Sequence, residues 1–119
     1  MTLNEIESFC RGLPGCEVRY PFESNPELRA WCLGKKMFAW TITSSVPIVV
    51  QLKANPELIS TLIESYEGMT PGYHMNKRHW ISVDANMCEE SMLRDLLEDA
   101  HALIANALPR AERIRLLGD

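Results

Sequence analysis

The sequence lacks any long hydrophobic run, any internal repeat and any low-complexity tract. No stretch approaches the roughly 20 consecutive apolar residues that a membrane-spanning helix needs, so that class of protein is excluded. Polar and acidic residues begin the chain at Met1–Glu5, without the basic and then apolar order of a secretory signal. We therefore expect a cytoplasmic protein with no membrane partner. Its 119 residues suffice for one domain with a core of its own.

Cysteine occurs only four times and never as a C-x-x-C pair. That spacing excludes the common zinc and redox motifs, and a cytoplasmic protein rarely holds disulfides. His74 and His79 have no cysteine or carboxylate nearby at a ligand spacing, so no metal site is expected. His101 is expected at the surface or boundary of a helix. The cysteines are interpreted as small buried hydrophobic side chains: Cys10, Cys16, Cys32 and Cys88.

Catalytic signatures are also missing. The chain contains no G-x-S-x-G elbow, no phosphate-binding loop and no dinucleotide fingerprint. Ser44 and Ser45 lie in a predicted turn without an evident base, while the adjacent acids Glu89 and Glu90 are typical of a helix start. We therefore expect a protein that is not an enzyme and that uses no cofactor.

The chain has no basic excess, since its formal net charge is −4. Such a total disfavours a general nucleic-acid binder. The charge is nevertheless uneven along the sequence: residues 35–79 sum to +2, whereas residues 84–101 sum to −5. A local positive surface is therefore compatible with the acidic total, provided that folding gathers the cations of the middle section.

Periodicity predicts an α+β fold in the order α-β-β-β-β-α-β-α, with helices packed on one face of an antiparallel meander sheet. A capping box at Thr2 and Glu5 and an N-cap at Asn55 indicate two of the helix starts. Residues 1–109 form the predicted domain, and residues 110–119 a C-terminal tail that is either one helical turn or a loose segment. The predicted helices span residues 3–11, 55–68 and 89–108, and the predicted strands span residues 16–20, 29–33, 36–43, 48–53 and 79–83.

The aromatic residues of the central strands invite two interpretations. In residues 36–43, Phe38, Trp40 and Ile42 alternate with smaller or more flexible side chains, as in a strand with two distinct faces. Phe38, Trp40 and Trp31 are expected to fill the space between the sheet and the helices. The alternative is a platform on which nucleic-acid bases stack.

One segment, residues 70–83, concentrates cations, hydrogen-bond donors and aromatic rings. Its first part, residues 70–77, is expected to be a loop or irregular turn. Lys77 and Arg78 suit contacts with phosphates, and nearby side chains suit hydrogen bonding: His74, Asn76 and His79. The alternative is that Trp80 belongs to the core, that His74 and Asn76 brace the turn, and that the two cations are merely solvated.

Four motifs, in this order, resemble the MmcQ/YjbR family of small bacterial proteins over about residues 3–108: Tyr20-Pro21-Phe22, Gly34-Lys35-Lys36-Met37-Phe38-Ala39-Trp40, Leu52-Lys53-Ala54-Asn55-Pro56 and the block from Pro71 to Val83. The resemblance implies an α+β fold similar to the CyaY/frataxin-like arrangement. It also implies a "double wing" motif for binding DNA.

The resemblance therefore predicts a non-enzymatic DNA-binding protein with a basic hairpin and a basic loop. The alternative is a protein-interaction or small-anion-binding module without nucleic-acid activity, which the acidic total and the acidic third helix favour. The residues expected to contact nucleic acid are Lys35, Lys36, Lys53, His74, Asn76, Lys77, Arg78 and His79.

Overall fold

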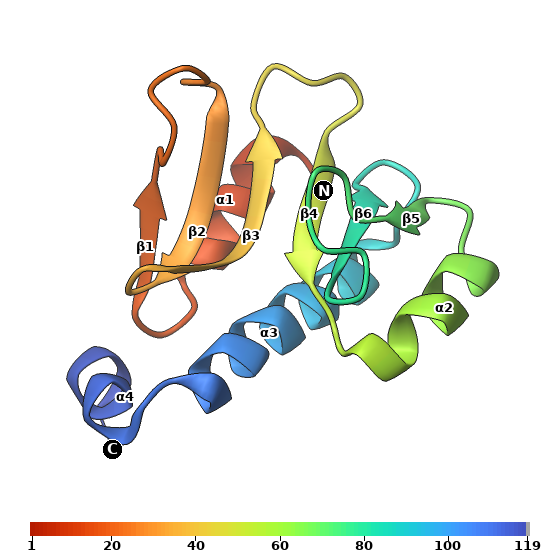
Figure 1. Cartoon of the computed structure of the whole chain (residues 1–119). Helices are drawn as coiled ribbons and strands as arrows, with labels where there is room; N and C mark the ends of the chain where they lie inside the picture. Colours follow the sequence, from red (N-terminus) through yellow and green to blue (C-terminus); the bar gives the residue numbers. More distant parts are fainter. Residues whose placement is uncertain (119) are drawn as a thin grey trace.

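The fold is a six-stranded antiparallel sheet with helices against one face, seen in a computed structural model that describes residues 1–118 (Figure 1). Four strands form the predicted meander, and β6 then pairs with β4 and places β5 at the far edge. The α+β class is thus confirmed. The strands are β1 (Cys16–Arg19), β2 (Leu28–Leu33), β3 (Lys36–Ile42), β4 (Val49–Lys53), β5 (Met69–Pro71) and β6 (Trp80–Asp84).

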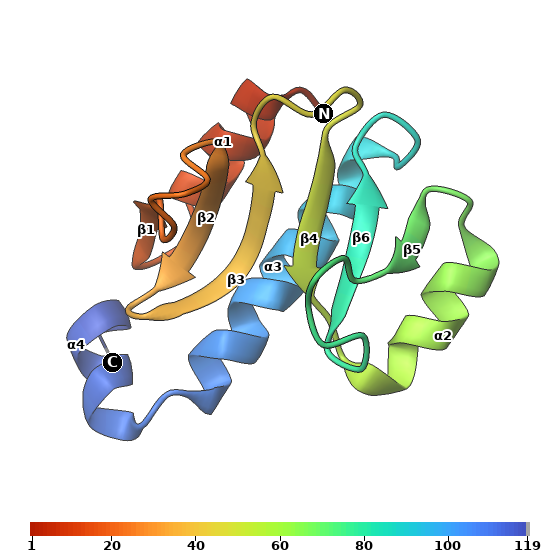
Figure 2. The same ribbon diagram turned by 45° about the horizontal axis from the view of Figure 1, so that its top comes forward.

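Helices α1 and α3 lie behind the sheet in Figure 2, and α2 flanks its β5 edge. The predicted capping box is present, with Thr2 and Glu5 each accepting a hydrogen bond from the backbone N–H of the other. Asn55 caps α2 through its side chain. No helix within residues 1–118 combines the length and the apolar character that crossing a membrane requires. The helices are α1 (Leu3–Arg11), α2 (Pro56–Ser65), α3 (Glu90–Ala107) and α4 (Arg110–Leu117).

Two elements add to the predicted order. The three-residue strand β5 lies where the sequence predicted the start of a loop, and it includes Pro71, which an edge strand tolerates. The segment after residue 109 is the helix α4, longer than one turn, and its Leu116 and Leu117 pack against the core. The last residue of the predicted tail, Asp119, lies outside the described residues.

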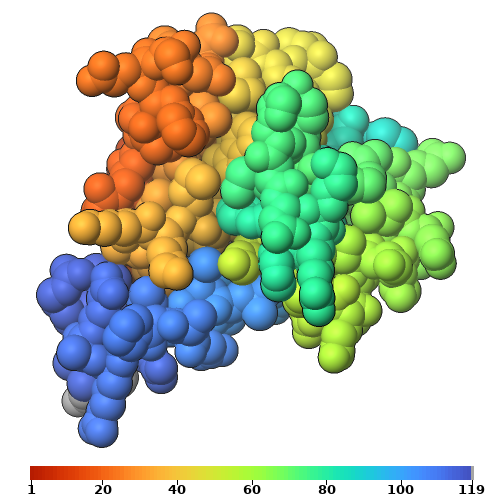
Figure 3. Space-filling model, in the orientation of Figure 1, coloured from red at the N-terminus to blue at the C-terminus, as the bar shows by residue number. Residues whose placement is uncertain are grey.

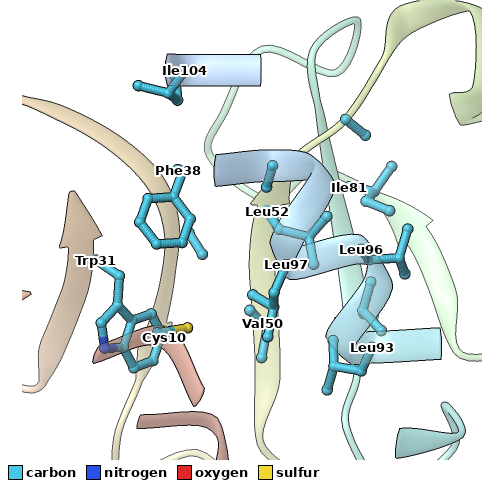
Figure 4. Packing of buried hydrophobic residues seen from close by; sticks show 14 of the residues in the cluster. Cys10, Trp31, Phe38, Val50, Leu52, Ile81, Leu93, Leu96, Leu97 and Ile104 are labelled. Carbon is cyan, nitrogen blue, oxygen red and sulfur yellow. The ribbon is translucent and has the colours of Figure 1, made fainter. Parts of the chain in front are cut away.

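The main core fills the space between the sheet and helices α1 and α3 (Figure 4). Trp31 and Phe38 contribute to this core from the sheet and Leu93 and Leu97 from α3, and all four are fully buried. His101 of α3 also lies in this layer, which corrects the predicted surface or boundary position. Its Nε2 donates a hydrogen bond to the carbonyl oxygen of Pro14 at 2.7 Å, because burial of a polar ring requires a partner.

A β-bulge in β3 changes the predicted alternation of its side chains. Trp31 pairs with Ala39 and Cys32 pairs with Met37, so Phe38 is an extra residue opposite β2. Phe38 and Ala39 therefore both join the core on the helix side. Trp40 belongs instead to a separate apolar cluster. The expectation that Trp40 fills the space between sheet and helices was wrong, whereas Trp31 and Phe38 do fill it.

The second cluster covers part of the sheet face that carries no helix. Its buried members come from β2, β3 and the start of β6: Leu28, Ala30, Cys32, Trp40 and Trp80. Met37 and Ile42 of β3, and Met75 from the segment between β5 and β6, pack against them. Residues 72–79, here called the covering loop, cross in front of β4 and β6 (Figure 1). On this face, exposed side chains of the covering loop therefore lie next to a buried apolar cluster.

Candidate nucleic-acid interface

The covering loop begins with a close approach to the sheet. The backbone N–H of Gly72 donates to the carbonyl oxygen of Trp80 at 3.2 Å. The next N–H, that of Tyr73, donates to Oε1 of Gln51 in β4 at 3.0 Å. Gln51 is 4% exposed and also accepts from the Ser82 hydroxyl at 2.7 Å. One buried amide therefore anchors the loop to two strands.

Gln51 was not among the predicted site residues. Its only signal is an amide within an otherwise apolar stretch of a predicted strand. Buried amides are rare unless a defined partner is present, so such a residue marks a point where another segment docks. The segment that docks on Gln51 is the covering loop, and it lies there because β4 pairs with β6. The residues next to Gln51 in the sequence do not reveal this partner.

The middle of the covering loop is held by its own side chains. Oδ1 of Asn76 accepts from the backbone N–H of Arg78 at 2.9 Å, and the Asn76 carbonyl accepts from the N–H of His79 at 3.0 Å. His74 has a positive φ of 56°, and its ring lies 3.9 Å from that of Tyr73 between centroids. Asn76 thus has the turn-bracing role that the sequence offered as an alternative.

The predicted cations stay unpaired. Lys77 and Arg78 are exposed, and so are Lys35 and Lys36, while Lys53 is partly buried. In the part of the chain that the structure describes, none of these five forms an ion pair. Carboxylates instead pair with five arginines elsewhere: Arg11, Arg19, Arg29, Arg94 and Arg115. These five cations are therefore free to meet an anionic ligand, as are Arg110 and Arg113 of α4, which form no ion pair among residues 1–118 either.

The covering loop and the C-terminal end of β4 lie together. Lys53 is paired with Trp80, the residue that follows the loop, and the carbonyl of His79 accepts from the N–H of Ala54 at 2.9 Å. Lys53 also borders the groove between α2 and α3, where Asp99 lies, so it is less favourably placed than the loop cations. Figure 3 shows the loop as a ridge on the helix-free face.

The hairpin lysines are separated from this group. The β2–β3 turn lies at the same end of the sheet as the covering loop, but on the other side of β3 (Figures 1 and 2). Lys36 lies directly opposite Leu33, whose side chain faces the helix layer. Because opposite residues of an antiparallel pair share one face of the sheet, Lys36 points away from the helix-free face. A Cβ on Gly34 would lie 2.9 Å from Oε1 of Glu112, so an acid of α4 adjoins the turn.

No thiol or metal cluster accompanies these cations. Within residues 1–118, no three histidine, cysteine or acidic side chains lie close enough together to hold a metal ion. Burial raises the pKa of the Cys16 thiol and of the Cys32 thiol to about 11, so both stay protonated at neutral pH. Within this region, the chemistry on offer is therefore hydrogen bonding, stacking and cationic contact.

Gly72→Ala is expected to lower the free energy of unfolding by about 2 kcal/mol and to displace the covering loop. A Cβ at this position would lie 2.8 Å from Cβ of Trp80 and 2.9 Å from its carbonyl oxygen, neither of which moves without shifting β6. Urea denaturation followed by circular dichroism measures the change. Gly12→Ala is the control, because its Cβ would meet nothing closer than 3.4 Å; equal losses in the two variants would contradict the prediction.

Known proteins share this architecture and sequence pattern. A family model described as YjbR matches residues 11–103. The chain is 33% identical over 105 residues to the uncharacterised protein YbdF of Escherichia coli O157:H7, covering 87% of this chain and 84% of that one. It is 26% identical over 115 residues to the uncharacterised protein YjbR of Escherichia coli strain K12, covering 95% of each.

Solved structures agree with these matches. The crystal structure of Deinococcus radiodurans protein DR2400, described as a DUF419 domain, superposes with a TM-score of 0.87 at 30% identity, covering 97% of this chain and 87% of that one. A crystal structure of a protein from Pseudomonas syringae gives a TM-score of 0.76 at 25% identity, covering 87% of this chain and 98% of that one. The resemblance seen in the sequence is confirmed, and the chain belongs to the YjbR family.

Proposed function

We propose that this protein is a non-enzymatic DNA-binding protein of the cytoplasm, with Lys77 and Arg78 as its main phosphate contacts. The supporting observation is that these two exposed cations have no carboxylate partner among residues 1–118 and stand on a braced loop. Contacts with the DNA phosphates need such free cations, because a cation that neutralises a phosphate releases a condensed counterion and so raises the affinity. Lys35 adds a weaker third contact from the β2–β3 turn, whereas Lys36 is directed away from the helix-free face.

The acidic total charge does not oppose this function strongly. The excess of acids lies on α3, which packs against the opposite face of the sheet from the covering loop (Figure 2). At physiological ionic strength, electrostatic potentials decay over about 8 Å. For a duplex at the loop, the electrostatic attraction to Lys77 and Arg78 is therefore stronger than the repulsion from the exposed acids behind the sheet.

The proposal predicts weak binding that depends steeply on salt. For about three phosphate contacts, the logarithm of the association constant should fall against the logarithm of salt concentration with a slope of about −2.7. A fourfold increase in salt then weakens binding about 40-fold. Fluorescence anisotropy of a labelled duplex measures this slope. Absence of binding at low salt, or a slope near zero, would overturn the proposal.

The second candidate is a protein-interaction or small-ligand module. The observation that favours a basic protein partner is the exposed acidic surface of α3, formed by Glu90, Asp95, Glu98 and Asp99. Among residues 1–118, Glu90 is the one member of this surface that pairs with an arginine. Capture of a basic protein that survives nuclease treatment, together with no DNA binding, would favour this candidate. The observation that favours a small-ligand module is a cavity beside Tyr73.

A further inference from the structure

A cavity of about 300 Å³ lies on the helix-free face, between the central strands and the base of the covering loop. Its apolar walls come from Trp40, Ile42 and Val49, and its rim from Tyr73, which is 61% exposed. This volume is at the small end of the range for ligand pockets, about 300–1,000 Å³. The cavity is therefore sized for a small molecule and not for a large cofactor.

The first polar feature of this cavity is an indole without a partner. Trp40 is 5% exposed and lines the cavity, and its buried Nε1 has no hydrogen-bond acceptor anywhere in residues 1–118. Trp31 shows the usual situation, because its Nε1 donates to Oε2 of Glu7 at 3.0 Å. A buried donor without an acceptor is costly and rare. Less than 1 Å² of Nε1 is accessible, so a bound acceptor reaches it and removes that cost when the indole turns toward the cavity.

The second polar feature is the amide of Gln51. Its Oε1 is occupied by the Tyr73 N–H and the Ser82 hydroxyl. The Tyr73 N–H fixes the orientation of the amide, since a flipped NH₂ would face this backbone donor with donors of its own. The amide nitrogen, which has no protein acceptor within the described chain, is thus left beside the same cavity. Among the described residues, no lysine, arginine or histidine lines the cavity.

We propose that this cavity binds a flat, uncharged heterocycle that presents carbonyl or ring-nitrogen acceptors, the chemistry of a nucleobase. Nε1 of Trp40 and the amide nitrogen of Gln51 donate to these acceptors, and Tyr73 covers the ring. The absence of a lining cation disfavours a fully charged ligand. The base belongs either to a free nucleoside or to a DNA strand, and binding of the former does not require the phosphate contacts proposed above.

The test is a titration of the ¹⁵N-labelled full-length protein, followed through its indole N–H resonances in two-dimensional NMR. The probes are uridine, cytidine, adenosine and a single-stranded oligothymidylate. The Trp40 resonance should move downfield and saturate, whereas that of Trp31, already bonded to Glu7, should stay in place. Trp40→Phe assigns the resonance, and it should weaken binding, measured by calorimetry, about tenfold.

Gln51→Glu provides the second variant. It retains an acceptor for Tyr73 and Ser82, so the loop stays anchored, but it replaces the free N–H donors with a carboxylate oxygen that repels the ligand acceptors. Binding should be lost while the Trp31 resonance is unchanged. A Trp40 resonance that no probe moves, or binding that Gln51→Glu leaves unaltered, would overturn the proposal.

The two sources of the base give different results. A shift with nucleosides supports a site for free small molecules, even if the duplex titration shows no DNA binding. A shift with the oligonucleotide alone, lost in Lys77→Glu plus Arg78→Glu, supports a base of a strand held by the loop cations. Failure of the cavity proposal is therefore distinguishable from failure of the DNA-binding proposal.

Discussion

Replacing Lys77 and Arg78 together with glutamate is expected to weaken DNA binding about 100-fold at low salt. Two phosphate contacts are lost, and two negative charges are placed beside the phosphates instead. The slope of the logarithm of affinity against the logarithm of salt should become shallower by about 2, because about two fewer counterions are released. Anisotropy titrations of the same duplex at several salt concentrations measure both quantities.

The matched control is Arg11→Glu with Arg94→Glu. It changes the net charge by the same amount, but these residues lie on α1 and α3, on the other side of the sheet, where each already pairs with a glutamate. We expect less than about a threefold change in affinity at physiological salt, since the potential is screened over about 8 Å. Equal losses in the two double variants would show that total charge, and not the covering loop, governs binding.

Glu7→Ala is expected to lower the free energy of unfolding by about 3 kcal/mol. The carboxylate of Glu7, on α1, accepts from Trp31 Nε1 at 3.0 Å and from a guanidinium nitrogen of Arg29 at 3.1 Å, both on β2. Its other oxygen accepts from Arg11. Truncation leaves the indole N–H of a fully buried tryptophan, and a largely covered guanidinium, without that acceptor. Urea denaturation monitored by circular dichroism measures the loss.

Glu17→Ala is the comparison for this prediction. Glu17 also pairs with an arginine, Arg19, but both side chains are about half exposed, so the pair should contribute less than about 1 kcal/mol. Glu7→Gln, which keeps an acceptor for Trp31, should fall between the two. If Glu7→Ala costs no more than Glu17→Ala, the carboxylate does not stabilise the packing of α1 on β2.

Local chemistry was sufficient to predict most of the elements. The capping box at Thr2 and Glu5 and the Asn55 cap lie where helices begin, because cap residues act on backbone groups within one turn. The strands from β1 to β4 and β6 were found from alternation and turn residues. The three-residue β5 was missed, because an edge strand that contains Pro71 has almost no pattern of its own.

The candidate site was predicted less completely. Residues 70–83 were correctly found to contain a loop with exposed cations, and Asn76 was one of two residues suggested to brace it. The hairpin lysines were grouped with the loop because both are basic and because the family resemblance implies a double wing. The pairing of Lys36 with Leu33 and the position of Glu112 separate them, and neither can be read from the neighbouring residues.

The sequence by itself determined the secondary structure, the family and the segment richest in exposed cations, because each depends on residues close together in the chain. Only the tertiary structure decided that a bulge at Phe38 places Trp40 on the face opposite the helices, beside Gln51 and the covering loop. A one-residue shift in strand register exchanges the two faces of a sheet. That register is set by packing between distant segments, so no local pattern contains it.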